Sequence, residues 1–595
     1  MPATSGFAAQ RWAVRILLAL APLWLIGILD RGLWTPDEPR EADIAWRMSQ
    51  QSDRTLPELA GTPFLEKPPL SYWMSATGLE LFGSSPAAAR SPNILYAGIT
   101  ALAIGALAFA MAGGAAATIA ALVSASLLIV FRVTVWLAPD AGLLAGCAVA
   151  ILGAYLGYTA PPGRRKLLGY CLMHLGAALG FMAKSAPGWL APALALGSLI
   201  VWERRWSELV RWELYVGFVL QGLVIGPWIA AVMRTPGGMD ALSALFWHNV
   251  VGRFMKVAAP AALNYSTAHK NAPGKYFLEL PVYVLPWTLL VVAALRRAWE
   301  RVRAPGAEGT PWRFAIAAAL PFLLVLSVAA TARDIYSAPG LLGLGVLVGL
   351  WMTEAQSSPT RFDGWAIRAT RWLVAIIGCG FALFACIMAF ATAQYAYLLA
   401  TAAVLAVAFE ATRRSARAQN GGNLRGSFGW LYGLYVAAVC ITGLAVFPAI
   451  DRWHDLASLA ARINNDGKHC DLALLSPDET TVAMLDHGLR TPFAVLDAQA
   501  AANAPAERVV SDWLNSHGTS ACILVLLPGH APGELTRLME LVHPLKQPDD
   551  GIAGALESKG TATVLRRYEI PQGRRYALLG PPHLETPDNP PPRGY

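Results

Sequence analysis

Long apolar runs alternate with short polar connections along most of the chain. Runs of about 17–25 residues are long enough to cross a lipid bilayer as helices. About thirteen such runs follow one another between the N-terminus and residue 448. They cover roughly 12–30, 91–112, 114–134, 141–160, 167–183, 186–202, 213–233, 278–295, 314–332, 338–352, 372–391, 394–411 and 428–448. The pattern predicts an α-helical protein with multiple membrane crossings, and we interpret the first run as a retained helix.

The pattern changes at about Asp451, where charged and polar residues return. Short β-like runs alternate from there on with helical stretches, as in a small α/β domain. The β-like runs lie at 472–475, 521–527 and 562–570, and the helical stretches at 481–487 and 532–542. We therefore expect a membrane domain over 1–450, an α/β domain over 451–580 and a disordered, proline-rich tail over 581–595.

Composition supports this division and excludes several classes of protein. Of the 595 residues, 55% are hydrophobic and only 14% are charged, a balance that places most of the chain in lipid. The net charge of +8 is spread over many connections, so no nucleic-acid partner is implied. No CxxC or HExxH spacing occurs, so there is no case for a structural zinc site. Cys470 and Cys522 lie in the polar C-terminal region, where an oxidising compartment would allow a disulfide.

The distribution of arginine predicts the orientation of the chain. Basic residues gather in five of the six alternate connections between apolar runs, the pattern of cytoplasmic loops, and only the tight connection near Gly113-Gly114 has no charge. These connections include 164–166, 204–211, 296–313, 361–371 and 413–425. The N-terminus is then cytoplasmic and the C-terminal domain periplasmic. This topology places the polar 31–90 loop, Asp140, Lys184, the 235–277 loop and the 333–336 segment on the periplasmic side, which indicates one extracytoplasmic site.

The first loop, 31–90, contains a polar stretch from Trp34 to Trp73 with many charges beside the membrane. Charges in such a place usually serve function. Thr35-Pro36-Asp37-Glu38 fits a capping box with proline at the first helical position, so a short helix should follow. Further along, Pro68 restricts Lys67 to an extended backbone.

The motifs DEPR at 37–40, EKPP at 66–69 and YW at 72–73 together resemble one family of bacterial membrane proteins. They are similar to the first loop of the aminoarabinose transferase and protein-mannosyltransferase-like glycosyltransferases. The resemblance implies the GT-C fold, a polyprenyl-phosphate sugar as donor and inversion at the anomeric carbon. It covers about residues 1–350 and scarcely touches the C-terminal domain.

Three acids are the catalytic candidates. Glycosyl transfer from a lipid phosphate requires a carboxylate that deprotonates or orients the acceptor. The resemblance assigns this role to Asp37, while Glu38 beside it also fits the capping of a helix. Asp140 follows Pro139 at the start of an apolar run, where it serves either the site or a helix cap.

Cations for the phosphate are expected in several segments. Lys67, with Glu66 beside it, resembles the lipid-phosphate contact of the family, and such a contact stabilises the leaving group. Arg40, Lys184 and Arg333 are further candidates, although each cation could instead extend to the membrane interface. Lys184 lies between two apolar runs, so it should face a polar cavity.

Two later segments complete the expected site. The 235–277 loop resembles the family's long periplasmic loop and places Arg253, His269 and Tyr276 in matching positions. Tyr336 also matches. The sequence departs from the family before this tyrosine, where relatives have a basic pair and this chain has Arg333 followed by Asp334.

The sequence thus predicts an inner-membrane GT-C enzyme that moves a sugar from a polyprenyl phosphate to an envelope acceptor such as lipid A phosphate. A protein O-mannosyltransferase-like enzyme and a transporter or flippase of lipid-linked sugars are the alternatives, and a scaffold role of the C-terminal domain is a third. A flippase should show ionisable residues near the bilayer midplane. The sequence leaves metal dependence open, since the Asp37–Glu38 pair offers oxygen ligands to a divalent cation such as Mg²⁺.

Overall fold

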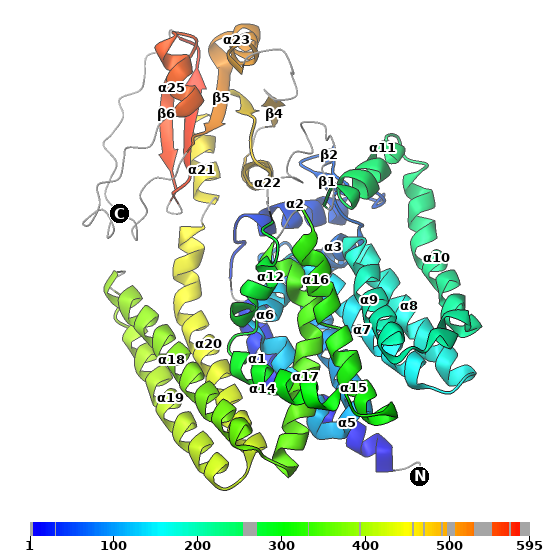
Figure 1. The fold of residues 1–595 in the computed structure, drawn as a ribbon. Helices are drawn as coiled ribbons and strands as arrows, with labels where there is room; N and C mark the ends of the chain where they lie inside the picture. Colours follow the sequence, from blue (N-terminus) through cyan, green and yellow to red (C-terminus); the bar gives the residue numbers. More distant parts are fainter. Residues whose placement is uncertain are drawn as a thin grey trace.

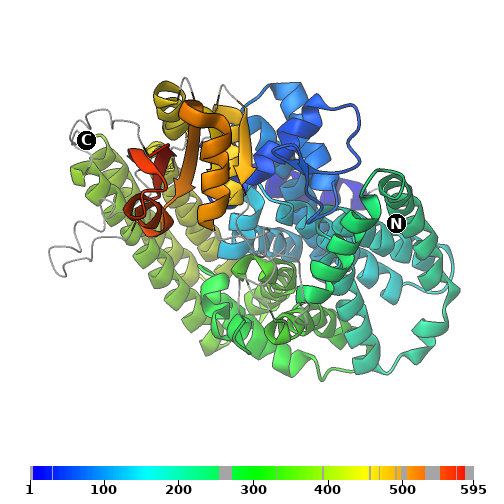
Figure 2. The ribbon, with the colours of Figure 1, turned by 90° about the horizontal axis from the view of Figure 1, so that it is seen from above.

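The computed structural model describes residues 4–29, 31–253, 271–330, 333–391, 394–454, 457–467, 470–489, 492–496, 506–528, 550–570 and 573–582. A bundle of helices forms the larger part, and a small α/β unit lies over one end of it (Figure 1). The first-loop helices lie at the same end of the bundle, which we call the site end (Figure 1). Seen from above, they lie beside the α/β unit (Figure 2). The two regions predicted from the hydropathy pattern are therefore both present.

Nine helical segments of the described residues are long and apolar enough to cross a membrane. Large apolar side chains on the outer helices are exposed, among them Leu399 and Phe409, as expected of surfaces that face lipid. The helices of the bundle, apart from those of the first loop, are α1 (Thr4–Leu29), α5 (Pro92–Ser126), α6 (Leu128–Val135), α7 (Asp140–Thr159), α8 (Arg164–Lys184), α9 (Pro187–Glu203), α10 (Trp212–Val232), α14 (Thr288–Arg301), α15 (Gly306–Ala317), α16 (Leu320–Val328), α17 (Ala338–Ser357), α18 (Arg361–Ala391), α19 (Tyr397–Asn420) and α20 (Leu424–Trp453). The protein is a multi-pass membrane protein.

Each predicted apolar run coincides with helix. The runs 91–112 and 114–134 meet where Ala112 and Gly113 leave the helical conformation within α5. The chain reverses there, since Asn93 near the start of α5 donates to the Trp136 carbonyl just after α6 at 2.7 Å. Gly113 has φ +81°, a left-handed value that glycine adopts without strain. The run at 278–295 is covered by two short helices, α12 (Lys275–Leu278) and α13 (Leu280–Tyr283), followed by α14. The total of about thirteen crossings therefore stays a prediction.

Helices α7 and α8 pack against each other along a seam of glycines. A Cβ atom placed on Gly153 would lie 2.2 Å from the backbone nitrogen of Met173, and one on Gly169 would lie 2.3 Å from that of Gly157. Only hydrogen fits at such distances, so the backbones are in contact, as at small-residue interfaces of membrane helices. The seam fixes the start of α7, Asp140, relative to the end of α8, Lys184.

The C-terminal unit is a five-stranded sheet in the order β4-β3-β5-β7-β6. Strands β4, β3 and β5 are parallel, and β7 runs antiparallel to both of its neighbours. Alternate residues of the strands pack on opposite faces, against α23 and α25 on one side and α21 and α22 on the other. The elements are α21 (Ala457–Asp466), β3 (Asp471–Leu475), α22 (Glu479–Gly488), β4 (Phe493–Leu496), α23 (Ala506–His517), β5 (Ala521–Leu526), α25 (Gly551–Ser558), β6 (Thr563–Glu569) and β7 (Arg575–Gly580).

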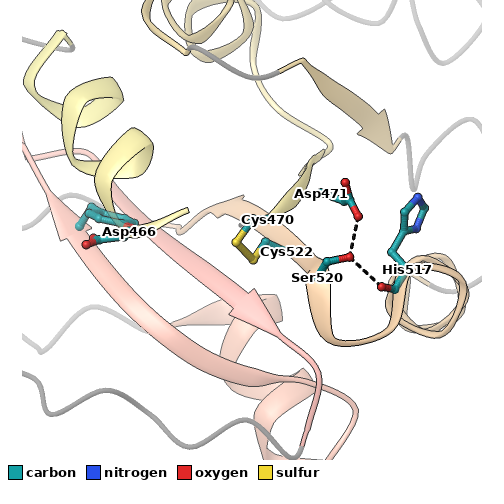
Figure 3. The surroundings of a disulfide bond; sticks show 7 residues. Asp466, Cys470, Asp471, His517, Ser520 and Cys522 are labelled. Carbon is teal, nitrogen blue, oxygen red and sulfur yellow. Dashed lines mark hydrogen bonds between the residues drawn. A yellow bond between two sulfur atoms is a disulfide. The ribbon is translucent and has the colours of Figure 1, made fainter. Parts of the chain in front are cut away.

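The expected disulfide is present and joins Cys470, just before β3, to Cys522 in β5 (Figure 3). The predicted strands and the helix at 481–487 correspond to β3, β5, β6 and α22, whereas β4 and β7 were not predicted. The predicted helix at 532–542 lies outside the described residues, as does all but the first two residues of the 581–595 tail.

Candidate functional site

The first loop folds into helices over the site end of the bundle. Its elements are α2 (Asp37–Gln50), the short strands β1 (Glu58–Leu59) and β2 (Thr62–Pro63), α3 (Leu70–Phe82) and α4 (Pro86–Arg90). The prediction of a capping box at residues 35–38 is wrong. Pro36 is the N-cap residue and makes no side-chain cap, while the Thr35 hydroxyl contacts His454 Nδ1 at 3.0 Å.

Glu38 has a different set of partners from those expected. Its carboxylate is paired with Arg31, with N–O distances of 2.5 and 2.7 Å, and with Arg90 at 3.2 Å. It also accepts the backbone N–H groups of Trp34 and Leu137, both at 2.8 Å. The side chain is 0% exposed. No atom of Glu38 faces a surface that a substrate could reach, so this candidate joins α2 and α4 to the segments that follow α1 and α6 within the scaffold.

Asp37 points the other way and meets a segment almost three hundred residues further along the chain. Arg333 donates to its two oxygens at 2.6 and 3.3 Å, and Arg40 lies at 3.7 Å. Burial alone would raise the pKa of Asp37. The hydrogen bond and charge of Arg333, with the charges of Arg40 and Lys67, outweigh burial and lower this pKa below its ordinary value. Asp37 is therefore an anion held by arginine.

Arg40, Glu66 and Lys67 form a second group beside Asp37. Both cations converge on Glu41, with Lys67 Nζ at 2.9 Å and Arg40 Nη2 at 2.8 Å from the same oxygen. Glu66 lies at 3.2 Å from Lys67 and at 3.7 Å from Arg40. Burial raises the pKa of Glu41, but the charges and hydrogen bonds of Lys67 and Arg40 lower it overall. Both cations thus have carboxylate partners in this structure.

Asp140 and Lys184 form the third part of the site. Lys184 donates to Asp140 at 2.5 Å, and its ammonium lies 4.9 Å from the centre of the Tyr336 ring, within cation–π range. Asp37 and Asp140 each begin a helix directly after a proline, where helix N-termini favour negative charge. One small cavity adjoins both acids and is lined by Asp37, Arg132, Val133, Trp136, Ala138, Asp140 and Ile335.

The later loop segments are placed only in part. Tyr276 is buried and donates its hydroxyl to the Arg333 carbonyl at 3.0 Å, which supports the segment that carries Arg333. The backbone of Arg253 ends the short helix η3 (Val251–Arg253), but its side chain lies outside the described residues. His269 also lies outside them. No interaction of these two candidates with the site is therefore described.

The departure from the family at Asp334 has a structural explanation. Asp334 forms an ion pair with Arg132 at the end of α6, and the Asp334 carboxylate also accepts its neighbour's backbone N–H at 2.9 Å. The acid therefore faces Arg132, while Arg333 beside it faces Asp37. The negative charge of Asp334 is therefore compensated by Arg132, next to the cavity.

The sequence did not indicate three residues of this region. Glu41 follows the DEPR motif by one position and could have been recognised from its place on the Asp37 side of α2. Arg132 ends an apolar run and resembles any interfacial arginine. Glu479 lies in the C-terminal domain and contacts Arg40 Nη1 at 2.5 Å, and no local signal connects residues so far apart in the sequence.

The arrangement can bind an anion and hold a nucleophile. Carboxylates of Asp37 and Asp140 adjoin the cavity, and the cations Arg333 and Lys184 are within hydrogen-bonding distance of them. The carboxylates of Asp37 and Glu38 engage different arginines, so they do not form a shared pair of ligands for a divalent cation. Such a group of charges suits a reaction in which a phosphate leaves and a hydroxyl attacks.

Comparison with known proteins identifies the fold. The crystal structure of ArnT from Cupriavidus metallidurans bound to undecaprenyl phosphate superposes with a TM-score of 0.66, covering 97% of this chain and 98% of that chain at 18% identity. The apo form of the same protein gives a TM-score of 0.66 as well. The structure is therefore that of a multi-pass membrane protein with the GT-C fold.

Sequence relatives narrow the class. The family described as dolichyl-phosphate-mannose-protein mannosyltransferase matches residues 66–230. The undecaprenyl phosphate-alpha-4-amino-4-deoxy-L-arabinose arabinosyl transferases of Serratia proteamaculans and Pseudomonas paraeruginosa are 32% and 29% identical over 49% and 57% of this chain. The matched part spans 51% and 59% of these two relatives. The chain is thus similar in sequence to the aminoarabinose transferases and to the protein-mannosyltransferase-like family, the resemblance that its first-loop motifs predicted.

Proposed function

We propose that the protein is an inverting glycosyltransferase that takes a sugar from a polyprenyl phosphate. The observation that carries this proposal is the cavity that adjoins both Asp37 and Asp140 at one end of a membrane bundle, with Arg333 and Lys184 beside it. The names of the sequence relatives point to the same chemistry. A polyprenyl chain would lie among the helices, and its sugar phosphate would reach the site end.

In the proposed reaction, the acceptor oxygen attacks the anomeric carbon of the donor sugar. The bond between that carbon and the phosphate oxygen breaks, and polyprenyl phosphate leaves with the bonding electron pair. Asp37 orients the acceptor and takes its proton where the acceptor is a hydroxyl. The lowered pKa of Asp37 keeps its carboxylate ionised for this task at neutral pH.

The cations serve the phosphate. Charge develops on the phosphate oxygen as the bond breaks, and positioned cations stabilise this charge in a site with little water. Arg333 and Lys184 contact the two acids that adjoin the cavity, while Arg40 and Lys67 lie next to Asp37. We assign Lys184 and Tyr336 to one wall of the donor site, and Arg40, Glu66 and Lys67 to the other.

The proposed place of the reaction is the periplasmic face of the bacterial inner membrane. The alternation of arginine-rich connections supports a cytoplasmic N-terminus and a periplasmic C-terminal domain. The disulfide between Cys470 and Cys522 agrees with an oxidising compartment. The site end would then face envelope acceptors, and we propose lipid A phosphate as the acceptor.

A protein O-mannosyltransferase-like activity is the second candidate, because the matching family model carries that description. Mass spectrometry of lipid A, envelope glycans and envelope proteins from cells with and without the gene distinguishes the two. Loss of an aminoarabinose or another sugar from lipid A supports the first candidate, and loss of a hexose from a protein supports the second. If no envelope component changes in an expressing strain, and the purified protein transfers no sugar from polyprenyl-phosphate donors, the proposed function is wrong.

A further inference from the structure

The C-terminal domain packs directly on the helix that begins with Asp37. Helix α22 follows β3 at the carboxyl ends of the three parallel strands, the edge where α/β domains commonly bind their ligands. Here that edge meets α2 (Figure 1). Glu479, the first residue of α22, contacts Arg40 at 2.5 Å, and the Thr480 hydroxyl donates to the Pro36 carbonyl at 2.8 Å.

The rest of the contact between the two helices holds them in register. Ala483 is fully buried in one apolar cluster with Ile44 and Met48 of α2. At the other end of α22, Asp486 forms an ion pair with Arg47. The docking surface is therefore apolar in its middle and has an ion pair at each end. Only one of these pairs, the one with Arg40, lies beside Asp37.

The guanidinium of Arg40 is held from two sides by different parts of the chain. Its Nη1 faces Glu479 of the C-terminal domain, and its Nη2 faces Glu41 of α2 at 2.8 Å. A planar guanidinium with two fixed arms has little freedom to rotate. This geometry keeps Nη2 at 3.7 Å from Asp37. Glu479 is 30% exposed, so its side of the ion pair borders the solvent above the site.

We infer that the C-terminal domain is part of the active site, and that Glu479 is a positioning residue that fixes Arg40 beside Asp37 for binding of the donor's phosphate. The inference rests on the proposed function. It assigns a role to a domain that the sequence resemblance scarcely covers, and it explains why the site end carries a domain docked through α22.

The test compares two carboxylates of the same helix. Glu479→Ala removes the partner of Arg40, and Glu479→Gln removes the charge but keeps an oxygen that can accept from Nη1. Asp486→Ala is the matched control, because it removes an ion pair from the same docking surface at the far end from Asp37. Each protein is purified full length in nanodiscs. Binding of undecaprenyl phosphate, the kcat and KM for a polyprenyl-phosphate sugar, and the Tm are measured.

We expect Glu479→Ala to weaken undecaprenyl phosphate binding and raise the donor KM about tenfold, the scale of one lost charge-assisted hydrogen bond. The kcat should change less than about threefold, since Asp37 stays in place. Glu479→Gln should recover part of the affinity and bind about threefold more weakly than wild type, because a neutral acceptor makes a weaker hydrogen bond than a carboxylate. Asp486→Ala should stay within about twofold of wild type, the scale of a partly exposed ion pair.

Wild-type donor affinity in Glu479→Ala would overturn the inference. The inference would also fail if Asp486→Ala weakened donor binding as much, because α22 would then act only by docking the C-terminal domain. If Glu479→Ala does not fold, Glu479→Gln with the wild-type Tm is the deciding variant. Donor affinity between the wild-type value and a tenfold loss would support the positioning role of Glu479. Unchanged donor affinity would refute it. A wild-type protein that neither binds undecaprenyl phosphate nor transfers sugar would instead refute the proposed function, and the role of Glu479 with it.

Discussion

Asp37 and Glu38 are adjacent in the sequence and yet belong to two different regions of the molecule. The region around Glu38 is closed: two arginines and two backbone N–H groups surround a carboxylate without exposed surface. The region around Asp37 is open to a cavity and is held mainly by one arginine from a distant loop. Successive helical residues point in different directions, so one turn of α2 supplies both regions.

The difference shows what a carboxylate can do in each setting. A buried carboxylate whose partners are all protein groups contributes specificity to the fold, and replacing it leaves its partners without compensation. A carboxylate beside a cavity, held mainly by one arginine, can exchange that partner for a ligand. The four predictions below test this contrast from the largest expected effect to the smallest.

Glu38→Ala should destabilise the protein most. Arg31 and Arg90 would both remain buried without a counter-charge, and breaking a buried ion pair in this way costs about 3–5 kcal/mol. We expect a poor yield of folded protein and a clearly lower Tm in detergent. Glu38→Gln, which keeps an acceptor for the Trp34 and Leu137 N–H groups, should lose less. Normal yield and Tm in Glu38→Ala would contradict the structural role of Glu38 and with it the contrast to Asp37.

Asp37→Asn should leave the fold unchanged and remove the activity. Asparagine keeps the size of the side chain and is well tolerated near a helix start, so the Tm should change little. Turnover of the polyprenyl-phosphate donor should fall about 10²-fold or more, the usual scale for a lost general base. Near-normal turnover would move the catalytic role to Asp140. An equal loss of turnover and folded protein would show that Asp37 is structural too.

Arg333→Gln should change the pH dependence of turnover. Burial raises the pKa of Asp37, whereas the hydrogen bond and charge of Arg333 are the main causes that lower it. Removing Arg333 leaves burial less opposed, so the pKa of Asp37 rises. The acid limb of the kcat/KM profile, where protonation of Asp37 removes the base, should then move to higher pH. A profile with an unchanged acid limb in Arg333→Gln would contradict this assignment.

Asp334→Asn should have the smallest effect. The ion pair of Asp334 with Arg132 is partly exposed, with the arginine side chain 44% accessible, and such pairs contribute about 0–1 kcal/mol. Tm should stay almost constant, and turnover should change by no more than a few fold. The measurement is a side-by-side Tm and donor titration with wild type. A loss as large as that of Asp37→Asn would place Asp334 in the catalytic centre.

The main features of the fold were accessible from the sequence because lipid imposes a simple rule. Membrane helices require long apolar runs, so each run coincides with helix. The number of crossings is harder to predict, since a run such as 278–295 can be divided among several helices. In the C-terminal domain β4 and β7 were missed, because burial in a sheet depends on neighbouring strands.

The site was predicted in part for the same reason. Hydropathy and charge counting placed Asp37, Asp140, Lys184 and the 333–336 segment on one side of the membrane, and the structure brings them together. The partners within the site could not be derived. A single carboxylate such as Glu479 has no sequence feature that names Arg40 as its neighbour, and the direction in which Glu38 points depends on packing against α4 and α6.

The glycine seam between α7 and α8 has a consequence for how the protein tolerates mutation. The Asp140–Lys184 pair joins the ends of two helices whose spacing is set by backbone contact, so an added methyl group at Gly153 or Gly169 must push the helices apart. Such a substitution is conservative on any chemical scale, and it lies several turns of helix away from the acid. In a scan of random variants, we expect glycine-to-alanine changes that abolish function to appear along this seam, far from the Asp140–Lys184 pair.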